Sequence, residues 1–184
     1  MSIFDDLIRK CPVPHAHSND CPGCATPDLA FARHDHSLCA SDVLVRADAL
    51  MAAKGVRLTP VRRKVLEILL EAHRAMGAYD VLTRLAAEGF GNQPPVAYRA
   101  LDFLEEQGLV HRIRRLNAFT ACMHPGEAHV PAFLICKVCD MVAEAPVAAV
   151  LTALEQAARA RGFLIDRSTF EAIGLCPTCQ KVTS

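Results

Sequence analysis

Two Cys-x-x-Cys pairs near the carboxyl end of the chain have the spacing of metal ligands. Cys136 and Cys139 lie in the stretch FLICKVCDMVAEA, and Cys176 and Cys179 lie in GLCPTCQK. A Cys-x-x-Cys turn directs both sulfurs to one ion, and zinc accepts four thiolates in a tetrahedron. Four protein ligands leave no open position, so the sequence predicts a structural zinc that joins two distant parts of the chain. A redox dithiol is the alternative, but that chemistry needs only one pair.

A second set of potential ligands is dispersed along the chain: His111, Cys122, His129 and Glu144. The first two fall in neighbouring predicted strands, His129 lies in the segment that follows, and Glu144 is an acid in an otherwise apolar strand. Each also has an explanation without metal. Cys122 can be a small buried hydrophobe, His129 a solvated loop residue and Glu144 a charge on an edge strand. From the residues alone, both interpretations stay open.

The first forty residues carry a third Cys-x-x-Cys pair in a different setting. Residues 11–40 are rich in Cys, His, Pro and Asp without helical or strand periodicity, which predicts a flexible tail over residues 1–40. Pro and Gly inside the third pair give it the turn chemistry of a zinc knuckle. We therefore consider a further zinc ion in this tail, against loose metal capture or no role. Its potential ligands are Cys11, His15, His17, Cys21, Cys24, His34, His36 and Cys39.

Length and composition limit the class of protein. The 184 residues are 52% hydrophobic with zero formal net charge, which suits one ordinary domain or two small ones. No apolar run approaches the roughly 20 residues that span a bilayer, and the start lacks the features of a signal peptide. We therefore expect a cytoplasmic protein with no membrane partner, whose nine cysteines serve metal ligation rather than disulfides.

Helical periodicity dominates the middle of the chain. Ser41 predicts the N-cap of a first helix, and Thr59-Pro60 predicts the start of a second. Two β-like runs then flank a turn at Leu116-Asn117. Helices followed by a hairpin are the element order of a winged helix-turn-helix, which we expect over residues 41–123. The remaining predicted elements of this segment are helices over 78–89 and 94–108 and strands within 109–115 and 118–123.

The last segment, residues 124–184, predicts a small α/β domain in the order β-β-α-β-β, so the fold class as a whole is α+β. A unit of this size is near the lower limit for burying its own core and needs a metal, a partner chain, or both. The expected strands are 132–136, 141–145, 163–166 and 170–175, with a helix between Pro146 and Gly162.

The helix over 94–108 suits contact with nucleic acid. Tyr98 and Arg99 fall in its first turns, away from the apolar stripe, where base edges and phosphates are met. Residues 41–115 are also the only positive segment, with twelve Lys and Arg against nine Asp and Glu, which favours an anionic partner. A helical bundle with a hairpin and no role in DNA binding is the alternative at this point.

The stretches RLTPVRRKVLEIL, AYDVL, PPVAYRALDFLEEQGLVHRI, CKVC and GLCPTC together resemble the ferric uptake regulator superfamily, and most of all its zinc uptake regulator branch. The resemblance covers about residues 41 to 180. It implies a homodimeric repressor that binds a double-stranded DNA operator in response to zinc and controls zinc uptake genes. It further implies a winged-helix domain, a dimerisation domain and about two zinc ions per subunit.

The resemblance also assigns roles to residues. It places a structural zinc on Cys136, Cys139, Cys176 and Cys179, and a regulatory zinc between the domains on His111, Cys122, His129 and Glu144. It brings Tyr79, Tyr98 and Arg99 to the DNA. A thiolate such as Cys122 beside imidazoles favours zinc over iron or manganese. Thr83 and Ala86 depart from an acid/base pair that some relatives use between neighbouring dimers, which leaves cooperativity between dimers in doubt.

Three other functions compete with this interpretation. An iron- or peroxide-sensing regulator would keep the fold, and the cysteine at position 122 argues against it. A zinc-buffering protein would account for the tail, and specific operator binding separates it from a repressor. A thiol oxidoreductase would need an exposed cysteine of low pKa, which no pattern marks. Since no catalytic constellation is visible, we expect no enzyme.

Overall fold

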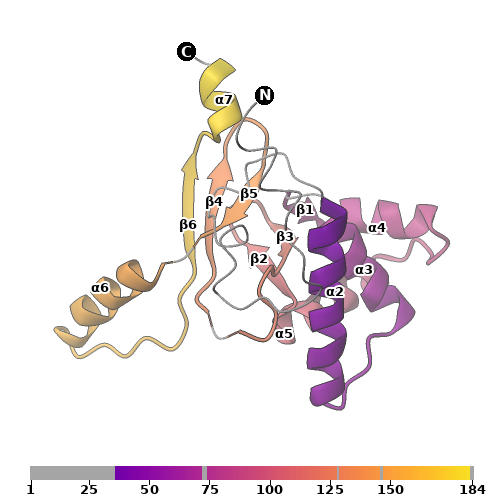
Figure 1. Cartoon of the computed structure of the whole chain (residues 1–184), viewed down its shortest axis with the longest axis horizontal. Helices are drawn as coiled ribbons and strands as arrows, with labels where there is room; N and C mark the ends of the chain where they lie inside the picture. Colours follow the sequence, from indigo (N-terminus) through magenta and orange to yellow (C-terminus); the bar gives the residue numbers. More distant parts are fainter. Residues whose placement is uncertain (1–35, 72–73, 128, 146, 183–184) are drawn as a thin grey trace, which may run out of the picture.

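The computed structural model has two three-stranded sheets that meet near the centre of the molecule, with most of the helices on the side of the first sheet (Figure 1). One sheet belongs to the helical amino-terminal half and has the strand order β1-β3-β2. The other belongs to the carboxyl-terminal part and has the order β5-β4-β6. The structure describes residues 36–71, 74–127, 129–145 and 147–182.

The first described helix starts earlier than the sequence predicts. Helix α2 spans His36–Ala53, so Ser41 lies inside it, and the prediction of an N-cap at Ser41 is wrong. His36 and Cys39, two potential ligands of the expected tail, therefore lie in this helix. A serine is a frequent cap, but its side chain cannot stop a helix whose preceding residues are able to continue the backbone hydrogen bonds.

Helix α3, Pro60–Leu70, begins where the sequence predicts. The hydroxyl of Thr59 accepts a hydrogen bond from the backbone N–H of Arg62, and Pro60 occupies the first helical position, where no N–H is needed. Capping of this kind stabilises a helix by about 1 kcal/mol. The predicted apolar stripe is buried at Val65, Ile68 and Leu69, whereas Ala72 lies outside the described residues.

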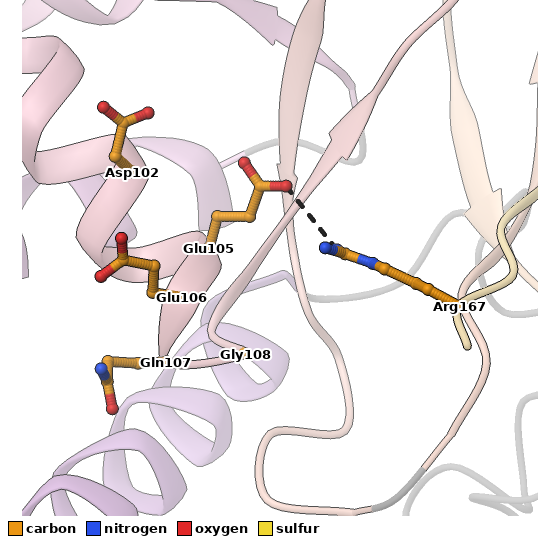
Figure 2. A pocket seen from close by; sticks show the side chains of 6 residues that line it. All are labelled: Asp102, Glu105, Glu106, Gln107, Gly108 and Arg167. Carbon is orange, nitrogen blue, oxygen red and sulfur yellow. Dashed lines mark ion pairs between the residues drawn. The ribbon is translucent and has the colours of Figure 1, made fainter.

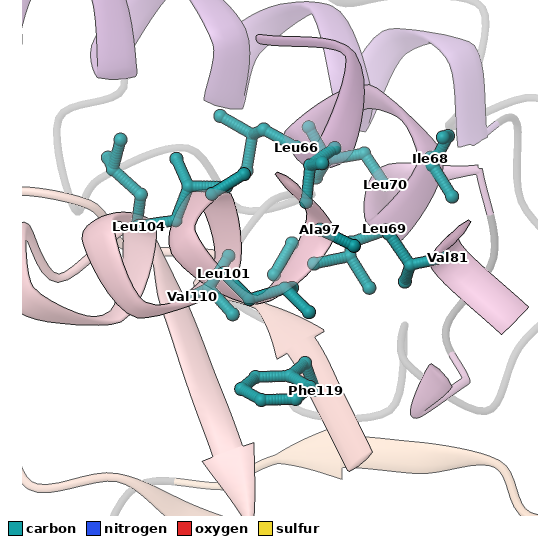
Figure 3. Packing of buried hydrophobic residues seen from close by; sticks show 14 of the residues in the cluster. Leu66, Ile68, Leu69, Leu70, Val81, Ala97, Leu101, Leu104, Val110 and Phe119 are labelled. Atoms are coloured by element: carbon teal, nitrogen blue, oxygen red, sulfur yellow. The ribbon is translucent and has the colours of Figure 1, made fainter. Parts of the chain in front are cut away.

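Helices α4, Ala78–Ala87, and α5, Pro94–Glu106, complete the helical half and pack on α3. Gly108 follows α5 with a positive φ of 73°, the left-handed conformation that glycine adopts without strain. Ala86, which has the spacing of the apolar face of α4, is nevertheless exposed. These three helices, together with α2 and the first sheet, enclose one apolar cluster (Figure 3). Its labelled members are Leu66, Ile68, Leu69, Leu70, Val81, Ala97, Leu101, Leu104, Val110 and Phe119.

The predicted hairpin is present as β2, Val110–Ile113, and β3, Ala118–Ala121, paired antiparallel. Asn117 closes the turn between them with a φ of 46°, a conformation that asparagine tolerates better than most residues. A two-residue strand β1, Met76–Gly77, adds to the other side of β3. The element order of a winged helix is therefore confirmed, and we call residues 110–121 the wing.

The second sheet is built around β4, Ala132–Cys136, which pairs antiparallel with β5, Val142–Glu144, and parallel with β6, Phe170–Gly174. A short helix α7, Pro177–Val182, follows. The strand expected over residues 163–166 is not formed, and this prediction is wrong. Phe163 and Leu164 are instead 63% and 88% exposed, because a short apolar run becomes a strand only where a neighbour pairs with it.

Helix α6, Ala148–Arg159, stands apart from the rest of the molecule in Figure 1 and has no buried residue. Its apolar side chains include Val150 and Leu154, which are 51% and 41% exposed. Within the part of the chain that the structure describes, no helix is long and apolar enough to cross a membrane.

The wing packs directly against the second sheet. Ile113 is completely buried and forms an apolar cluster with Phe133, Ile135 and Val142. A further bridge joins Arg74 to Met141. The two halves of the protein are therefore in contact through side chains on the wing, and this contact brings the dispersed ligands of the sequence together.

Candidate metal centres and nucleic-acid surface

The four cysteines near the carboxyl end gather at one end of the second sheet. Cys136 ends β4, Cys139 lies in the turn after it, Cys176 follows β6, and Cys179 lies in α7. Their sulfur atoms all lie within 4.8 Å of one another. The sulfurs of Cys139 and Cys176 are 3.7 Å apart, which matches the roughly 3.7 Å that two ligands of a tetrahedral zinc would have with Zn–S bonds of about 2.3 Å.

Backbone amides donate to two sulfurs of this cluster and favour a thiolate at Cys136, whereas the side-chain hydrogen bond with Cys176 raises the pKa of the Cys179 thiol to about 12. The N–H of Cys176 donates to the sulfur of Cys136, and the N–H of Cys179 donates to the sulfur of Cys176, each at 3.4 Å. Burial alone would raise the pKa of Cys136, but backbone hydrogen bonds from Cys176, Val138 and Cys139 lower it to about 6. The donor set therefore fits zinc. Cys136 has the low pKa that a redox thiol needs, but it is only 1% exposed, unlike a reactive cysteine.

The dispersed set, His111, Cys122, His129 and Glu144, also comes together, and its ligand atoms lie within 4.8 Å of one another. His111 is on β2, Cys122 follows β3, His129 lies in the connecting segment and Glu144 ends β5. We call these four residues the junction cluster, because the first two belong to the winged helix and Glu144 to the second sheet.

The spacing within the junction cluster fits a metal ion. Nε2 of His129 lies 3.3 Å from Nε2 of His111 and 3.6 Å from the sulfur of Cys122. Two nitrogens on a tetrahedral zinc are separated by about 3.3 Å, and a nitrogen and a sulfur by about 3.6 Å. Oε1 of Glu144 lies 3.8 Å from His111 and 2.8 Å from His129. This buried oxygen nevertheless accepts no hydrogen bond, as expected of an atom placed to bind an ion.

A hydrogen bond orients His129 for ligation. Its Nδ1 lies 2.9 Å from the carbonyl oxygen of Glu127, an acceptor, so Nδ1 carries the proton and donates it there. Nε2 is then unprotonated and directs its lone pair into the junction cluster. Such a partner on the far nitrogen is the usual support of a histidine that binds metal.

Burial keeps the side chains of His111 and Cys122 uncharged in the absence of an ion. Burial, opposed by the Glu144 carboxylate, lowers the pKa of His111, so its imidazole is neutral near pH 7. Burial and then the Glu144 charge raise the pKa of Cys122 to about 12. The thiol must therefore release its proton to bind zinc.

Arg46 on α2 fixes the segment that follows Cys122. Its guanidinium donates to the carbonyl oxygen of Met123 at 3.1 Å and to Asp42 at 2.6 Å, and lies 3.6 Å from Glu127. This contact could not be predicted from the sequence, because nothing in the helical pattern relates α2 to a loop so far along the chain.

The three residues predicted to approach DNA are all exposed on the helical half. Tyr79 and Tyr98 are 67% and 42% exposed, and their rings meet edge to face at 6.5 Å. Arg99 is exposed on α5 beside Tyr98. The predicted tail ligands up to His34 lie outside the described residues.

Comparisons with known proteins agree with this arrangement. The model of the "Ferric uptake regulator family" matches residues 53–172, which include the junction cluster. The Zinc uptake regulation protein of Escherichia coli (strain K12) is 36% identical over 142 residues, which are 77% of this chain and 83% of that protein.

Solved structures of zinc regulators have the same fold. The structure named "Zinc Uptake Regulator Complexed With Zinc AND DNA" is similar with a TM-score of 0.74 at 35% identity, over 78% of this chain and 97% of the other. The structure named holo XcZur has a TM-score of 0.68 at 36% identity, over 80% and 99%. The helical half is thus a winged-helix DNA-binding domain and the second sheet part of a dimerisation domain. The chain belongs to the ferric uptake regulator family.

Proposed function

We propose that this protein is a cytoplasmic, zinc-responsive repressor that binds operator DNA and controls genes for zinc uptake. The observation that carries the proposal is the junction cluster, in which two ligands from the winged helix meet a carboxylate from the dimerisation domain. Ligands drawn from both domains make metal binding depend on how the domains are arranged.

Zinc at the junction cluster would favour one domain arrangement. An ion held by His111 and Cys122 on one side and Glu144 on the other binds only when these residues are close, so it shifts the population toward the docked state. The thiolate of Cys122 favours zinc over iron or manganese at this position. The family resemblance to zinc regulators points the same way.

We infer about two zinc ions per subunit, one at each cluster. The four-cysteine cluster is drawn entirely from the dimerisation domain, which supports a structural role. We propose separately that the Cys- and His-rich tail, residues 1–40, binds a further zinc ion, and the zinc stoichiometry of a chain without the tail tests this.

We infer that the active form is a homodimer. Helix α6 exposes Val150 and Leu154, and the adjoining loop exposes Leu164 at 88%. Leu134 of the central strand β4 is also 43% exposed. A helix with no buried residue is not held by its own chain, and apolar surface of this extent is typical of an interface between subunits.

We infer that α5 enters the major groove of the operator with its own Tyr98 and Arg99, that Tyr79 of α4 lies beside it, and that Arg99 reaches a base or a phosphate. The exposure of all three side chains and the contact between the two tyrosine rings support this docking. Arg114 and Arg115 on the wing are exposed as well, and their charge suits the flanking phosphates.

A metal-titrated gel shift tests the proposal. We expect zinc to activate binding to an operator fragment at lower free concentration than iron or manganese, at fixed salt. An iron-specific response would favour the iron- or peroxide-sensing alternative. Absence of specific DNA binding with every metal, in a protein that still takes up zinc, would favour a zinc-buffering protein instead.

A further inference from the structure

A carboxylate of the dimerisation domain accepts hydrogen bonds from the main chain of the turn in the wing. Oε1 of Glu171 on β6 accepts a hydrogen bond from the backbone N–H of Arg114 at 2.7 Å, and Oε2 accepts one from Arg115 at 3.2 Å. Two successive N–H groups form a small anion-binding site, and bonds of this kind to a charged acceptor are stronger than those between neutral groups. The contact joins the two domains at a point outside the junction cluster.

This contact is in register with the junction cluster. Across the second sheet, Glu144 on β5 pairs with Phe133 on β4, and Phe133 pairs with Glu171 on β6. Residues in one such row point to the same face of a sheet. That face is the one on the wing side, because Phe133 packs on Ile113 and its ring lies 5.5 Å from that of His111.

The wing strand β2 is therefore attached to the sheet at two separate points. One is His111, which reaches Glu144 in the junction cluster, and the other is the turn at Arg114 and Arg115. Arg114 follows His111 by three positions of extended chain, a distance of about 10 Å. A single attachment would leave the wing free to pivot about that point. Two attachments, with the buried Ile113 between them, fix the angle between the wing and the second sheet.

We propose that Glu171 is a positioning residue that anchors the wing to the dimerisation domain and thereby sets the zinc concentration at which operator DNA is bound. The inference rests on the proposed function, since it concerns regulation at the same domain junction. The anchor stabilises the docked arrangement independently of the metal, so that zinc has less free energy to supply for docking.

A second polar contact between the domains provides a matched control. Arg167 lies 3.8 Å from Glu105, at a pocket beside the end of α5 (Figure 2). The Arg167 side chain is 69% exposed, and exposed ion pairs contribute little to stability. Glu105→Gln removes the same charge from the same junction without touching the backbone of the wing.

The test compares the unaltered chain with its variants Glu171→Gln and Glu105→Gln. Operator binding is followed by fluorescence anisotropy against free zinc, and amide exchange at 114 and 115 by mass spectrometry with fragmentation. We expect Glu171→Gln to raise the zinc midpoint roughly tenfold and to speed exchange of both amides by a similar factor, since a hydrogen bond to a charged group is lost. Glu105→Gln should change neither by more than about twofold.

The direction of the effect separates the anchor from simple electrostatics. Removing a negative charge near DNA would by itself favour binding, so a lower zinc midpoint in Glu171→Gln would overturn the proposal, as would an unchanged midpoint. Amide exchange in the unaltered protein is an independent check. Amides at 114 and 115 that exchange as fast as an unstructured chain would rule out the anchor, whatever the variant does. This measurement involves no DNA, so its outcome is distinct from failure of the repressor function.

Discussion

The two metal-ligand clusters differ in what the rest of the fold must do to form them. The four cysteines lie at one end of a single sheet, and backbone N–H groups already direct two of the sulfurs inward. The junction cluster requires the wing to dock on that sheet before His111 can approach Glu144. A cluster within one domain can only stabilise that domain, whereas a cluster across a junction can report on the arrangement of two domains.

The largest effect that this comparison predicts is on folding. Replacing Cys136 or Cys179 by Ser opens a closed four-thiolate site, which removes folding free energy that the small domain needs. We expect the thermal midpoint to fall by more than roughly 10 °C and the dimer to dissociate, measured by calorimetry and light scattering. A variant as stable and as dimeric as the unaltered protein would remove the distinction between the two clusters.

The matched substitution in the junction cluster is Cys122→Ser. We expect the fold and the dimer to survive, because only one buried sulfur changes. Zinc-dependent affinity for the operator should fall by roughly 5- to 150-fold, the usual range of coupling between two sites. An unaltered zinc response in anisotropy titrations would mean that regulation resides elsewhere.

A third substitution should leave both clusters intact. Arg99→Ala removes a contact from the exposed face of α5, at a cost of roughly 1–3 kcal/mol in operator binding if the guanidinium is bidentate to a base. Zinc content, measured by atomic emission, should not change. Normal operator affinity in this variant would move the recognition surface away from α5.

The smallest effect is expected from the amino-terminal tail. Since α2 begins at His36, deleting residues 1–35 spares the helix, whereas the boundary at residue 40 would remove its first turn. We expect the shorter deletion to preserve dimerisation and zinc-dependent operator binding, and at most to lower zinc stoichiometry. Loss of operator binding at saturating zinc would assign the tail to the DNA-binding apparatus.

Local patterns predicted most of the elements. Thr59 and Pro60 marked the start of α3 because capping depends on neighbouring residues alone, and the Leu116-Asn117 turn marked the wing for the same reason. Contacts between distant segments had no such signal. No strand formed over 163–166, although the residue types suit one, because no neighbouring strand pairs with this segment in the described part of the chain.

The two metal-ligand clusters also differ in how far they could be predicted from local patterns. The spacing of the four cysteines was sufficient to pair them, since both halves are local motifs. The junction cluster could be assembled only with the help of the family resemblance. Glu171 carried the same signal as Glu144, an acid in an otherwise apolar strand, but only the register of three strands relates it to the wing.

The Glu171 contact also has an evolutionary consequence. Its acceptors meet the main chain at positions 114 and 115, so every residue type except proline supplies the same donors. The side chains at these positions can therefore change, and with them the contacts to the flanking phosphates, while the link between the domains is inherited unchanged. Strength of attachment to the DNA backbone and retention of metal control are, on this wing, separable traits.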